Sequence, residues 1–314
     1  MKRILVTGAP GFVGQKLTRT LREQGYAVLE SDRVPDPGGA DYRVCDIADG
    51  ASVDDLIQWA APLYGIIHLA AMTFIPEAHA NPVAVMEVNL GGTIHLAQAI
   101  ARHTPQARLV FVSTSEVYGP PQELPVDESH PQNPQNPYAI SKAAADQYCA
   151  YAATSGLIDV LRIRPFNHSG AGQADTFVLS NFAKQIVAME KGLQPARMLV
   201  GNLDISRDFM HVDDVVCAYE LALRHGKSGA VYNVCSGASV MIRDALNALV
   251  SRSSVEVELV VDPDRIRPTD VKVVRGDHNA FTQLTGWLPK TPFEALLDEL
   301  LDYWRHQSVA DQRR

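Results

Sequence analysis

Continuously apolar runs alternate with segments of helical spacing through the first half of the chain. The runs are short and bounded by glycine or polar residues, which predicts buried strands at residues 3–7, 26–31, 65–70, 107–113 and 158–164. Between them, apolar positions recur at helical spacing and predict helices at residues 12–24, 52–60, 81–102 and 138–155. This alternation is typical of a sheet covered on both faces, so we expect an α/β fold with a Rossmann-like doubly wound parallel sheet.

Beyond residue 165 the alternation changes. We predict a loop at 170–176, a strand at 197–200 and a further buried strand at 230–234 that returns to the main sheet. Predicted helices follow at residues 177–191, 213–226, 241–252 and 292–306, with a Pro-, Arg- and Asp-rich connection at 262–270. We therefore expect a Rossmann domain of residues 1–167 plus about 206–239, and a smaller α/β substrate-binding lobe of about 168–205 plus 240–314.

The composition, 46% hydrophobic and 20% charged over 314 residues, is that of a globular protein. A formal net charge of -8 disfavours a non-specific nucleic-acid binder, so we expect no nucleic-acid partner. The four cysteines and ten histidines show no metal-ligand spacing, and we expect no metal. No apolar run has the length of a membrane span or the form of a signal peptide. We therefore expect a cytoplasmic protein without a membrane partner.

Three glycines, Gly8, Gly11 and Gly14, lie between the first predicted strand and the first predicted helix. In this position glycines permit a tight turn and a close backbone approach, while the helix N-terminus offers free N–H groups to a pyrophosphate. We therefore predict that this loop binds a dinucleotide, with Phe12 and Val13 at the same helix start.

The ends of the next two strands predict the adenosine site. Asp32 follows the second predicted strand, where a carboxylate can bond the ribose 2′-hydroxyl of NAD. Arg33 beside it can instead accept the 2′-phosphate of NADP. Asp46 and Ile47 follow a short third strand and either flank the adenine or form a solvated turn. We expect NAD or NADP as the cofactor, with Asp32 favouring NAD.

Two further motifs predict a catalytic site. Tyr138 and Lys142 in PYAISK lie one helical turn apart on one helix face. STSEVYG places Thr114 at the end of the strand predicted at 107–113, with Ser113 and Ser115 as alternative hydroxyls. A tyrosine can give a proton to a carbonyl as hydride arrives, because a neighbouring ammonium and the nicotinamide charge lower its pKa. The hydroxyl orients the same oxygen. The set therefore predicts proton-coupled hydride transfer.

Four segments together resemble the extended short-chain dehydrogenase/reductase family, whose members act on nucleotide-diphosphate sugars. They are TGAPGFVG (7–14), HLAA (68–71), STSEVYG (113–119) and PYAISK (137–142). The resemblance covers essentially the whole chain. The second half is similar to the GDP-6-deoxy-D-mannose reductases of that family, through RPFNHSGAGQ (164–173), VGNLDISRDF (200–209) and DPDRIRPTD (262–270).

The resemblance implies reduction of the 4-keto group of GDP-4-dehydro-6-deoxy-D-mannose to GDP-D-rhamnose by NAD(P)H. It also implies a homodimer in which the helices at 81–102 and 138–155 form a four-helix bundle. The implied cofactor contacts, beyond the glycine loop, Tyr138 and Lys142, are Leu69, Ala70, Ala71, Asn89 and Arg164. The implied contacts of the GDP-linked sugar are Thr73, Glu116, Asn167, Val178, Arg207 and Arg267.

Glu116 keeps other functions open. A Thr-x-Glu before VYG also occurs in nucleotide-sugar 4,6-dehydratases, where the glutamate removes a proton next to the 4-keto group. Glu116 is therefore also a candidate catalytic base, and GDP-mannose 4,6-dehydratase is the first alternative. A 4-epimerase that keeps its NAD bound and a non-catalytic sugar-nucleotide sensor are further alternatives. The alternative to a pyrophosphate contact is an ion pair with Asp208 or Asp204 for Arg207, and a surface position for Arg267. The sequence leaves the face of hydride attack at C4 open.

Overall fold

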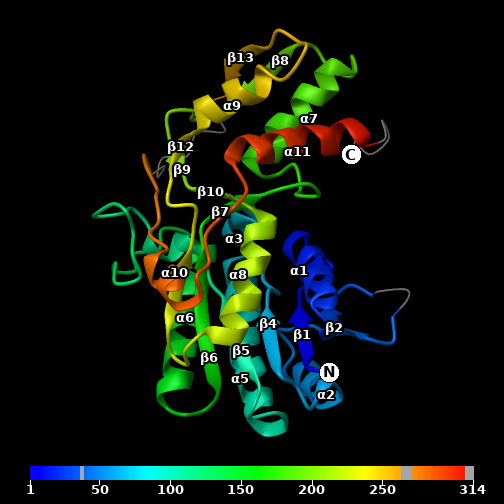
Figure 1. Cartoon of the computed structure of the whole chain (residues 1–314), viewed down its shortest axis with the longest axis vertical. Coiled ribbons are helices and arrows are strands. Elements are labelled where there is room, and N and C mark those ends of the chain that lie inside the picture. Colours follow the sequence, from blue (N-terminus) through cyan, green and yellow to red (C-terminus); the bar gives the residue numbers. More distant parts are fainter. Residues whose placement is uncertain (36–38, 263–270, 308–314) are drawn as a thin grey trace.

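The computed structural model describes residues 1–35, 39–262 and 271–307. A seven-stranded sheet in the order β11-β6-β5-β4-β1-β2-β3 forms its centre, and every neighbouring pair is parallel (Figure 1). The chain builds outward from β1 in both directions, so the strand order reverses between β1 and β4 and leaves a crevice at their carboxyl ends. The strands are β1 Arg3–Thr7, β2 Ala27–Asp32, β3 Tyr42–Val44, β4 Gly65–His68, β5 Arg108–Val112, β6 Asp159–Pro165 and β11 Val231–Val234.

Each face of this sheet is covered by helices, because the strands carry apolar side chains on both sides. One face packs with α1, α8 and α10 into a buried cluster that includes Ile4, Leu17 and Tyr219. The other face packs with α2, α5 and α6 into a cluster that includes Leu5, Leu56 and Cys149. These helices are α1 Phe12–Glu23, α8 Val212–His225, α10 Asn279–Thr285, α2 Gly50–Ala60, α5 Gly92–His103 and α6 Pro137–Thr154.

Local signals fix the ends of several of these helices. Gly25, with a φ of 85°, follows α1 and donates its N–H to the Arg22 carbonyl at 2.9 Å, which ends the helix in a conformation that favours glycine. Asn136 precedes α6, and its side chain accepts the Ala139 N–H at 2.8 Å. Pro137 occupies the first turn of α6, where its missing N–H leaves no bond unmade.

A separate buried cluster lies beyond the carboxyl ends of the strands, at the top of Figure 1, and includes Phe182, Met198, Leu246 and Trp304. Short two-stranded sheets accompany this cluster. They pair β7 with β10, β9 with β12, and β8 with β13. The strands are β7 Asn167–Ser169, β8 Arg197–Val200, β9 Ser206–Arg207, β10 Phe209–His211, β12 Val240–Met241 and β13 Glu258–Val261. The helices are α7 Val178–Glu190, α9 Ile242–Val250 and α11 Phe293–His306.

The helix predicted at 81–102 is not one regular helix. It is α4 Pro82–Met86, a π-helical turn η1 Glu87–Gly91 and then α5. A π turn holds one extra residue per turn, and apolar spacing alone does not reveal a single inserted residue. The prediction also lacked the short helices α3 Ile75–Ala80, η2 Ser115–Tyr118 and α10, whose apolar repeats are too brief to stand out. Most of the connection predicted at 262–270 lies outside the described residues.

Within the described ranges, no helix combines the length and the apolar character needed to cross a membrane.

Candidate functional site

The glycine loop between β1 and α1 requires its glycines for steric reasons. Gly8 has a φ of 74°, and a Cβ there would lie 2.8 Å from the Ala70 backbone nitrogen. A Cβ on Gly14 would collide with the backbone of Gly8 and Ala9. Gly11 is the N-cap of α1 and provides no side-chain acceptor, so the first N–H groups of α1 remain free for an anion. The loop therefore fits the pyrophosphate of a dinucleotide.

The strand ends predicted to hold the adenosine lie next to this loop. The Gly8 N–H donates to the Ser31 carbonyl at 2.8 Å, which places the glycine loop one residue from Asp32. The half-buried Asp32 carboxylate accepts the Val34 N–H at 3.1 Å, and Arg33 is exposed. The Asp32 carboxylate and the Arg33 guanidinium thus flank the position predicted for the 2′ oxygen.

Asp46 and Ile47, which follow β3, are arranged differently from each other. Asp46 is exposed, and its carboxylate accepts the Ala48 N–H at 3.0 Å in a short turn. Ile47 is buried and packs on Gly92, where a Cβ would lie 2.8 Å from the Ile47 side chain. Ile47 is therefore packed into the protein against Gly92, whereas the Asp46 carboxylate bonds the backbone of its own turn.

The loop after β4 carries Leu69, Ala70, Ala71 and Thr73, and Asn89 holds it in place. From the π turn η1, the Asn89 amide accepts the Met72 N–H at 2.9 Å and donates to the Met72 carbonyl at 3.0 Å. Leu69, Ala70 and Ala71 are half-buried and Thr73 is exposed. Asn89 thus fixes the backbone of the predicted cofactor channel and is itself buried.

Thr114 and Tyr138 come together at the carboxyl end of β5. The Thr114 hydroxyl bonds the Tyr138 phenol and also accepts the Glu116 N–H at 3.2 Å. Burial raises the pKa of Tyr138 to about 12, the Thr114 hydrogen bond opposes this rise, and the Glu116 charge adds to it. In the protein alone, Tyr138 is therefore protonated at neutral pH and can act as a proton donor.

Lys142 lies one turn further along α6 and is buried. Its ammonium donates to the Val112 carbonyl at 2.5 Å and lies 4.3 Å from the centre of the Phe111 ring. Burial lowers the pKa of Lys142 to about 8, and the nearby Cys149 and Asp146 partly offset this. The expected lowering of the Tyr138 pKa by Lys142 is absent in the protein alone, because the ammonium is directed to the β5 backbone.

Glu116 lies in η2 at the edge of this site. It is exposed, and its carboxylate accepts the Asn136 amide N–H at 3.4 Å, next to the first turn of α6. The charge of Glu116 acts on Tyr138 through this proximity. The structure therefore brings Glu116 to the rim of the Thr114–Tyr138 pair.

Arg164, an expected cofactor contact, is held by hydrogen bonds inside the protein. Its guanidinium is buried, donates to both Asp146 carboxylate oxygens at 3.0 and 2.9 Å, and reaches the Tyr118 hydroxyl at 3.0 Å. These bonds use its donors inside the protein, since a buried guanidinium without acceptors would be costly. Phe166, two residues further along, is also buried.

The residues predicted to hold the sugar nucleotide come from the upper part of the chain. Asn167 opens β7 and is half-buried, whereas Val178 is the exposed first residue of α7. Arg207 in β9 donates to the carbonyls of Ser206 at 2.9 Å and Val271 at 2.7 Å. Arg267 lies outside the described residues.

The carboxylates proposed as alternative partners of Arg207 have other contacts. Asp204 pairs with Arg243 at 2.7 Å. Asp208 is completely buried and accepts the N–H groups of Ser236, Gly237 and Gly276 at 2.7, 3.0 and 3.1 Å.

Comparison with known proteins assigns the chain to a family. The family profile described as GDP-mannose 4,6 dehydratase matches residues 5–300. The GDP-6-deoxy-D-mannose reductase of Pseudomonas aeruginosa is 39% identical over 307 residues, 96% of this chain and 97% of that protein. The solved structure of RMD from Pseudomonas aeruginosa complexed with NADPH has a TM-score of 0.87 at 38% identity, covering 97% of this chain and 99% of that chain. UDP-glucose 4-epimerase of Thermus thermophilus in complex with NAD gives 0.86 at 27% identity, covering 98% and 100%. The chain belongs to the extended short-chain dehydrogenase/reductase family.

Membership of the extended short-chain dehydrogenase/reductase family confirms the predicted α/β fold of Rossmann type. Sequence reasoning missed several residues that shape the site of this family member. Ser141 links Asn89 to the Tyr138 carbonyl through bonds of 2.8 and 2.7 Å. His168 of β7 stacks on Phe12 of the glycine loop with ring centres 6.5 Å apart. The signal available for each was its place inside a quoted motif, PYAISK for Ser141 and RPFNHSGAGQ for His168.

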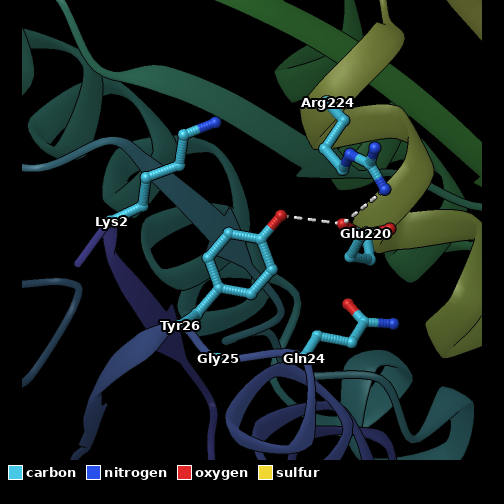
Figure 2. A pocket seen from close by; sticks show the side chains of 6 residues that line it. All are labelled: Lys2, Gln24, Gly25, Tyr26, Glu220 and Arg224. Carbon is cyan, nitrogen blue, oxygen red and sulfur yellow. Dashed lines mark hydrogen bonds and ion pairs between the residues drawn. The ribbon is translucent and has the colours of Figure 1, made fainter.

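A cavity of about 570 Å³ lies at the other end of the sheet and does not belong to this site. It is bordered by Lys2 and Tyr26, which precede β1 and β2, and by α8. Figure 2 shows Glu220 between the Tyr26 hydroxyl, at 2.8 Å, and Arg224, at 3.6 Å. Ligands of open parallel sheets bind at the carboxyl ends of the strands, which argues against a catalytic role here. Among the described residues, no group of three or more His, Cys, Asp or Glu side chains is arranged to hold a metal ion.

Proposed function

We propose that this protein reduces the 4-keto group of GDP-4-dehydro-6-deoxy-D-mannose to give GDP-D-rhamnose, using NADH or NADPH. The observation that carries the proposal is the match over nearly the whole chain to a GDP-6-deoxy-D-mannose reductase. Thr114, Tyr138 and Lys142 at the end of β5 support it, because a carbonyl reduction needs a positioned proton donor.

The cofactor proposal rests on the fit of the chain around a dinucleotide. Gly8, Gly11 and Gly14, with Phe12 and Val13 at the start of α1, would hold the pyrophosphate at a helix N-terminus that no side chain caps. Asp32 and Arg33 would face the 2′ oxygen of the adenosine ribose. The named structural relatives contain NADPH or NAD, and the acid–base pair at 32–33 suits use of either.

When bound, the reduced nicotinamide supplies a hydride to C4 of the sugar. Tyr138 donates its phenolic proton to the oxygen at C4, so the carbonyl becomes a hydroxyl. Thr114 donates a hydrogen bond to the same oxygen and orients it against the phenol. Lys142 would hold the nicotinamide ribose and would add a positive charge beside the tyrosinate that forms. Solvent returns the proton to Tyr138 before the next turnover.

We further propose that the part of the chain around α7, α9 and α11 forms the lobe that holds the GDP-sugar. Residues of about 168–205 plus 240–314 would make up this lobe, and 1–167 plus about 206–239 the cofactor domain. Asn167, Val178 and Arg207 lie in or beside its entry strands. A guanidinium suits the diphosphate of a GDP-sugar in an acidic protein, because its planar fork matches phosphate oxygens.

The enzyme is proposed to act as a homodimer in the cytoplasm. Val83 in α4 and Ile140 and Tyr151 in α6 are large apolar side chains, 69%, 43% and 61% exposed, on neighbouring helices, which supports a helix-to-helix interface. Cys45, Cys149 and Cys235 are free and buried, as expected for thiols in a reducing compartment. Sedimentation equilibrium tests the dimer, and replacement of Tyr151 by Glu should shift it toward monomer.

The proposed function is tested by mixing the protein with GDP-4-keto-6-deoxy-D-mannose and, separately, with GDP-D-mannose. Each mixture receives NADH or NADPH, and cofactor absorbance and sugar NMR are followed together. Stoichiometric cofactor oxidation with the keto sugar alone supports the reductase and identifies the C4 configuration. Conversion of GDP-mannose without net cofactor change would make the protein a dehydratase.

Glu116→Gln separates these two functions. The exposed Glu116 accepts one long bond from Asn136 and acts on Tyr138 by its charge, so a reductase should keep its kcat within about threefold in the glutamine variant. A dehydratase that uses Glu116 as its base should lose about a hundredfold or more.

A further inference from the structure

Asp146 is a carboxylate buried completely beneath the catalytic turn of α6. It follows Lys142 by four residues, so it lies about 6 Å further along the helix axis on the same face. Its oxygens accept from Arg162 at 3.1 Å and from Arg164 at 3.0 and 2.9 Å. The face of α6 that carries Tyr138 and Lys142 is therefore joined to β6 by two ion pairs.

The two arginines lie on β6, which pairs with β5, the strand that leads to Thr114. In the β5–β6 ladder, Arg162 is the partner of Phe111, and the Ser113 N–H donates to the Ile163 carbonyl at 2.7 Å. The carbonyl of Val112, between them, is the acceptor of the Lys142 ammonium. Lys142 and Asp146 thus anchor α6 at two adjacent points. Lys142 bonds the backbone of β5, and Asp146 bonds the arginines of β6.

The second anchor extends to the far edge of the sheet. Arg164 donates to the Tyr118 hydroxyl at 3.0 Å, which donates to the Asn233 side chain at 2.7 Å. Asn233 in β11 bonds the Val126 carbonyl at 2.9 Å. Because η2 contains Tyr118 and follows Thr114 directly, the same chain of bonds also holds the segment that carries the Thr114 hydroxyl.

Such a buried charge cluster is a poor source of stability. Removing two charges from water costs several kcal/mol per ion, and an apolar replacement of similar shape is often as stable. The apolar neighbours in α6, Cys149 and Ala152, already pack this helix on the sheet. The cluster therefore points to a role in geometry and charge at the adjacent lysine.

We propose that Asp146 is a positioning residue for the reaction: by clamping Arg162 and Arg164 it fixes α6 on β6, so that Lys142 and Tyr138 stay aligned with Thr114. The inference rests on the proposed hydride transfer for its catalytic consequence. Asp146 is completely buried among protein groups, and in this proposal it acts through Lys142.

The electrostatic surroundings of Lys142 agree with this role. Burial lowers the pKa of Lys142 to about 8, while Cys149 and the Asp146 carboxylate, both on α6, oppose that fall. On the other packed elements, His68 of β4 is neutral because burial lowers its pKa to about 3, and Arg162 and Arg164 of β6 are cationic. The Tyr138 hydroxyl is the remaining titratable group of the site on α6. Loss of the Asp146 charge leaves two cations near Lys142 and favours its neutral form.

The test compares Asp146→Asn with Asp159→Asn in the full-length protein. Asp159 pairs with Arg108 at 2.9 Å across the same two strands, at their opposite end. For Asp146→Asn we expect kcat for the keto sugar to fall at least tenfold, with both KM values within about threefold. The alkaline limb of kcat should move down by about one pH unit. Asp159→Asn should keep kcat within about twofold and leave the limb in place.

A second variant and a second readout keep the inference testable if Asp146→Asn does not fold. Arg164→Lys keeps the positive charge and loses the planar guanidinium that bonds both Asp146 oxygens. We therefore expect kcat to fall by about threefold or more, with the alkaline fall of kcat at the same pH as in the wild type. NADPH binding measured against pH by fluorescence needs no sugar. Its affinity should weaken above about pH 8 in the wild type and at lower pH in Asp146→Asn.

These readouts separate the two proposals. No wild-type turnover of the keto sugar would count against the proposed function, and the NADPH binding curves would still decide the role of Asp146. Equal limbs in Asp146→Asn and the wild type, or an Arg164→Lys enzyme with unchanged kcat, would overturn the inference.

Discussion

The Thr114 hydroxyl bonds the Tyr138 phenol, although one follows a central strand and the other opens a helix that begins after a long loop. The parallel sheet creates this meeting, since β5 ends where α6 begins its return. Both groups are neutral at pH 7 and both can donate to one substrate oxygen. This pair is the part of the site from which the first predictions follow.

Replacement of Tyr138 by Phe removes the proposed proton donor and leaves the ring. We expect kcat to fall by roughly a thousandfold, within the range seen for general acids, while GDP-sugar binding stays nearly unchanged. Stopped-flow cofactor oxidation and isothermal titration measure the two quantities. Tyr151→Phe is the matched control, because Tyr151 lies on the same helix and is 61% exposed. Turnover retained in Tyr138→Phe would exclude this tyrosine as the acid.

Replacement of Thr114 by Val removes the hydroxyl that orients the substrate oxygen. We expect kcat to fall by about a hundredfold, whereas Thr114→Ser, which keeps the hydroxyl, should stay within about tenfold. The valine variant also loses the bond from the Glu116 N–H, so its free energy of unfolding should drop by about 1 kcal/mol. Urea unfolding of each variant separates the two effects. Equal activity of Val and Ser would contradict the assigned role.

The activity should depend on the charge of Lys142. Because burial lowers its pKa to about 8, the cation that aligns the site is lost as pH rises through that value. We expect kcat to be level below pH 8 and to fall above it. The stability change has the opposite sign: between about 8 and the ordinary value of 10.5 the unfolded chain binds more protons, so the free energy of unfolding rises with pH. Profiles of kcat and of urea midpoints from pH 6 to 10 check the direction of both changes. Lys142→Met should show neither the fall in kcat nor the rise in the free energy of unfolding.

Replacement of Gly14 by Ala should abolish binding of the dinucleotide. The added methyl group meets the backbone of Gly8 and Ala9, which cannot move without opening the loop. We expect the NADPH dissociation constant to rise by more than about a hundredfold. Gly91→Ala is the control, because a Cβ there would lie 3.9 Å from the nearest atom on a helix. Fluorescence titration with NADPH gives both values.

The central sheet and its helices could be predicted because their apolar spacing is regular over many residues. The strands at β1, β4, β5 and β6 were found within one or two residues of their observed ends. The upper part was harder, since two-residue strands such as β9 and β12 have no periodicity of their own. Their pairing depends on residues far apart in the chain.

The candidate site shows the same division. Thr114, Tyr138 and Lys142 could be predicted because their chemistry depends on short, ordered motifs. The direction of the Arg164 side chain could not, because it is decided by Asp146 on another element. The partner of the Lys142 ammonium was also missed, since a backbone carbonyl leaves no trace in the sequence.

The buried cluster around α7, β8, α9 and α11 draws its residues from 179–209 and 240–304, with α8 and β11 returning to the main sheet between them. This cluster therefore does not come from one continuous stretch of the gene. A crossover between two related genes would exchange only part of that cluster and would break its packing. Divergence of substrate choice in this architecture is thus expected to proceed by point substitutions in place, and not by transfer of a ready-made module.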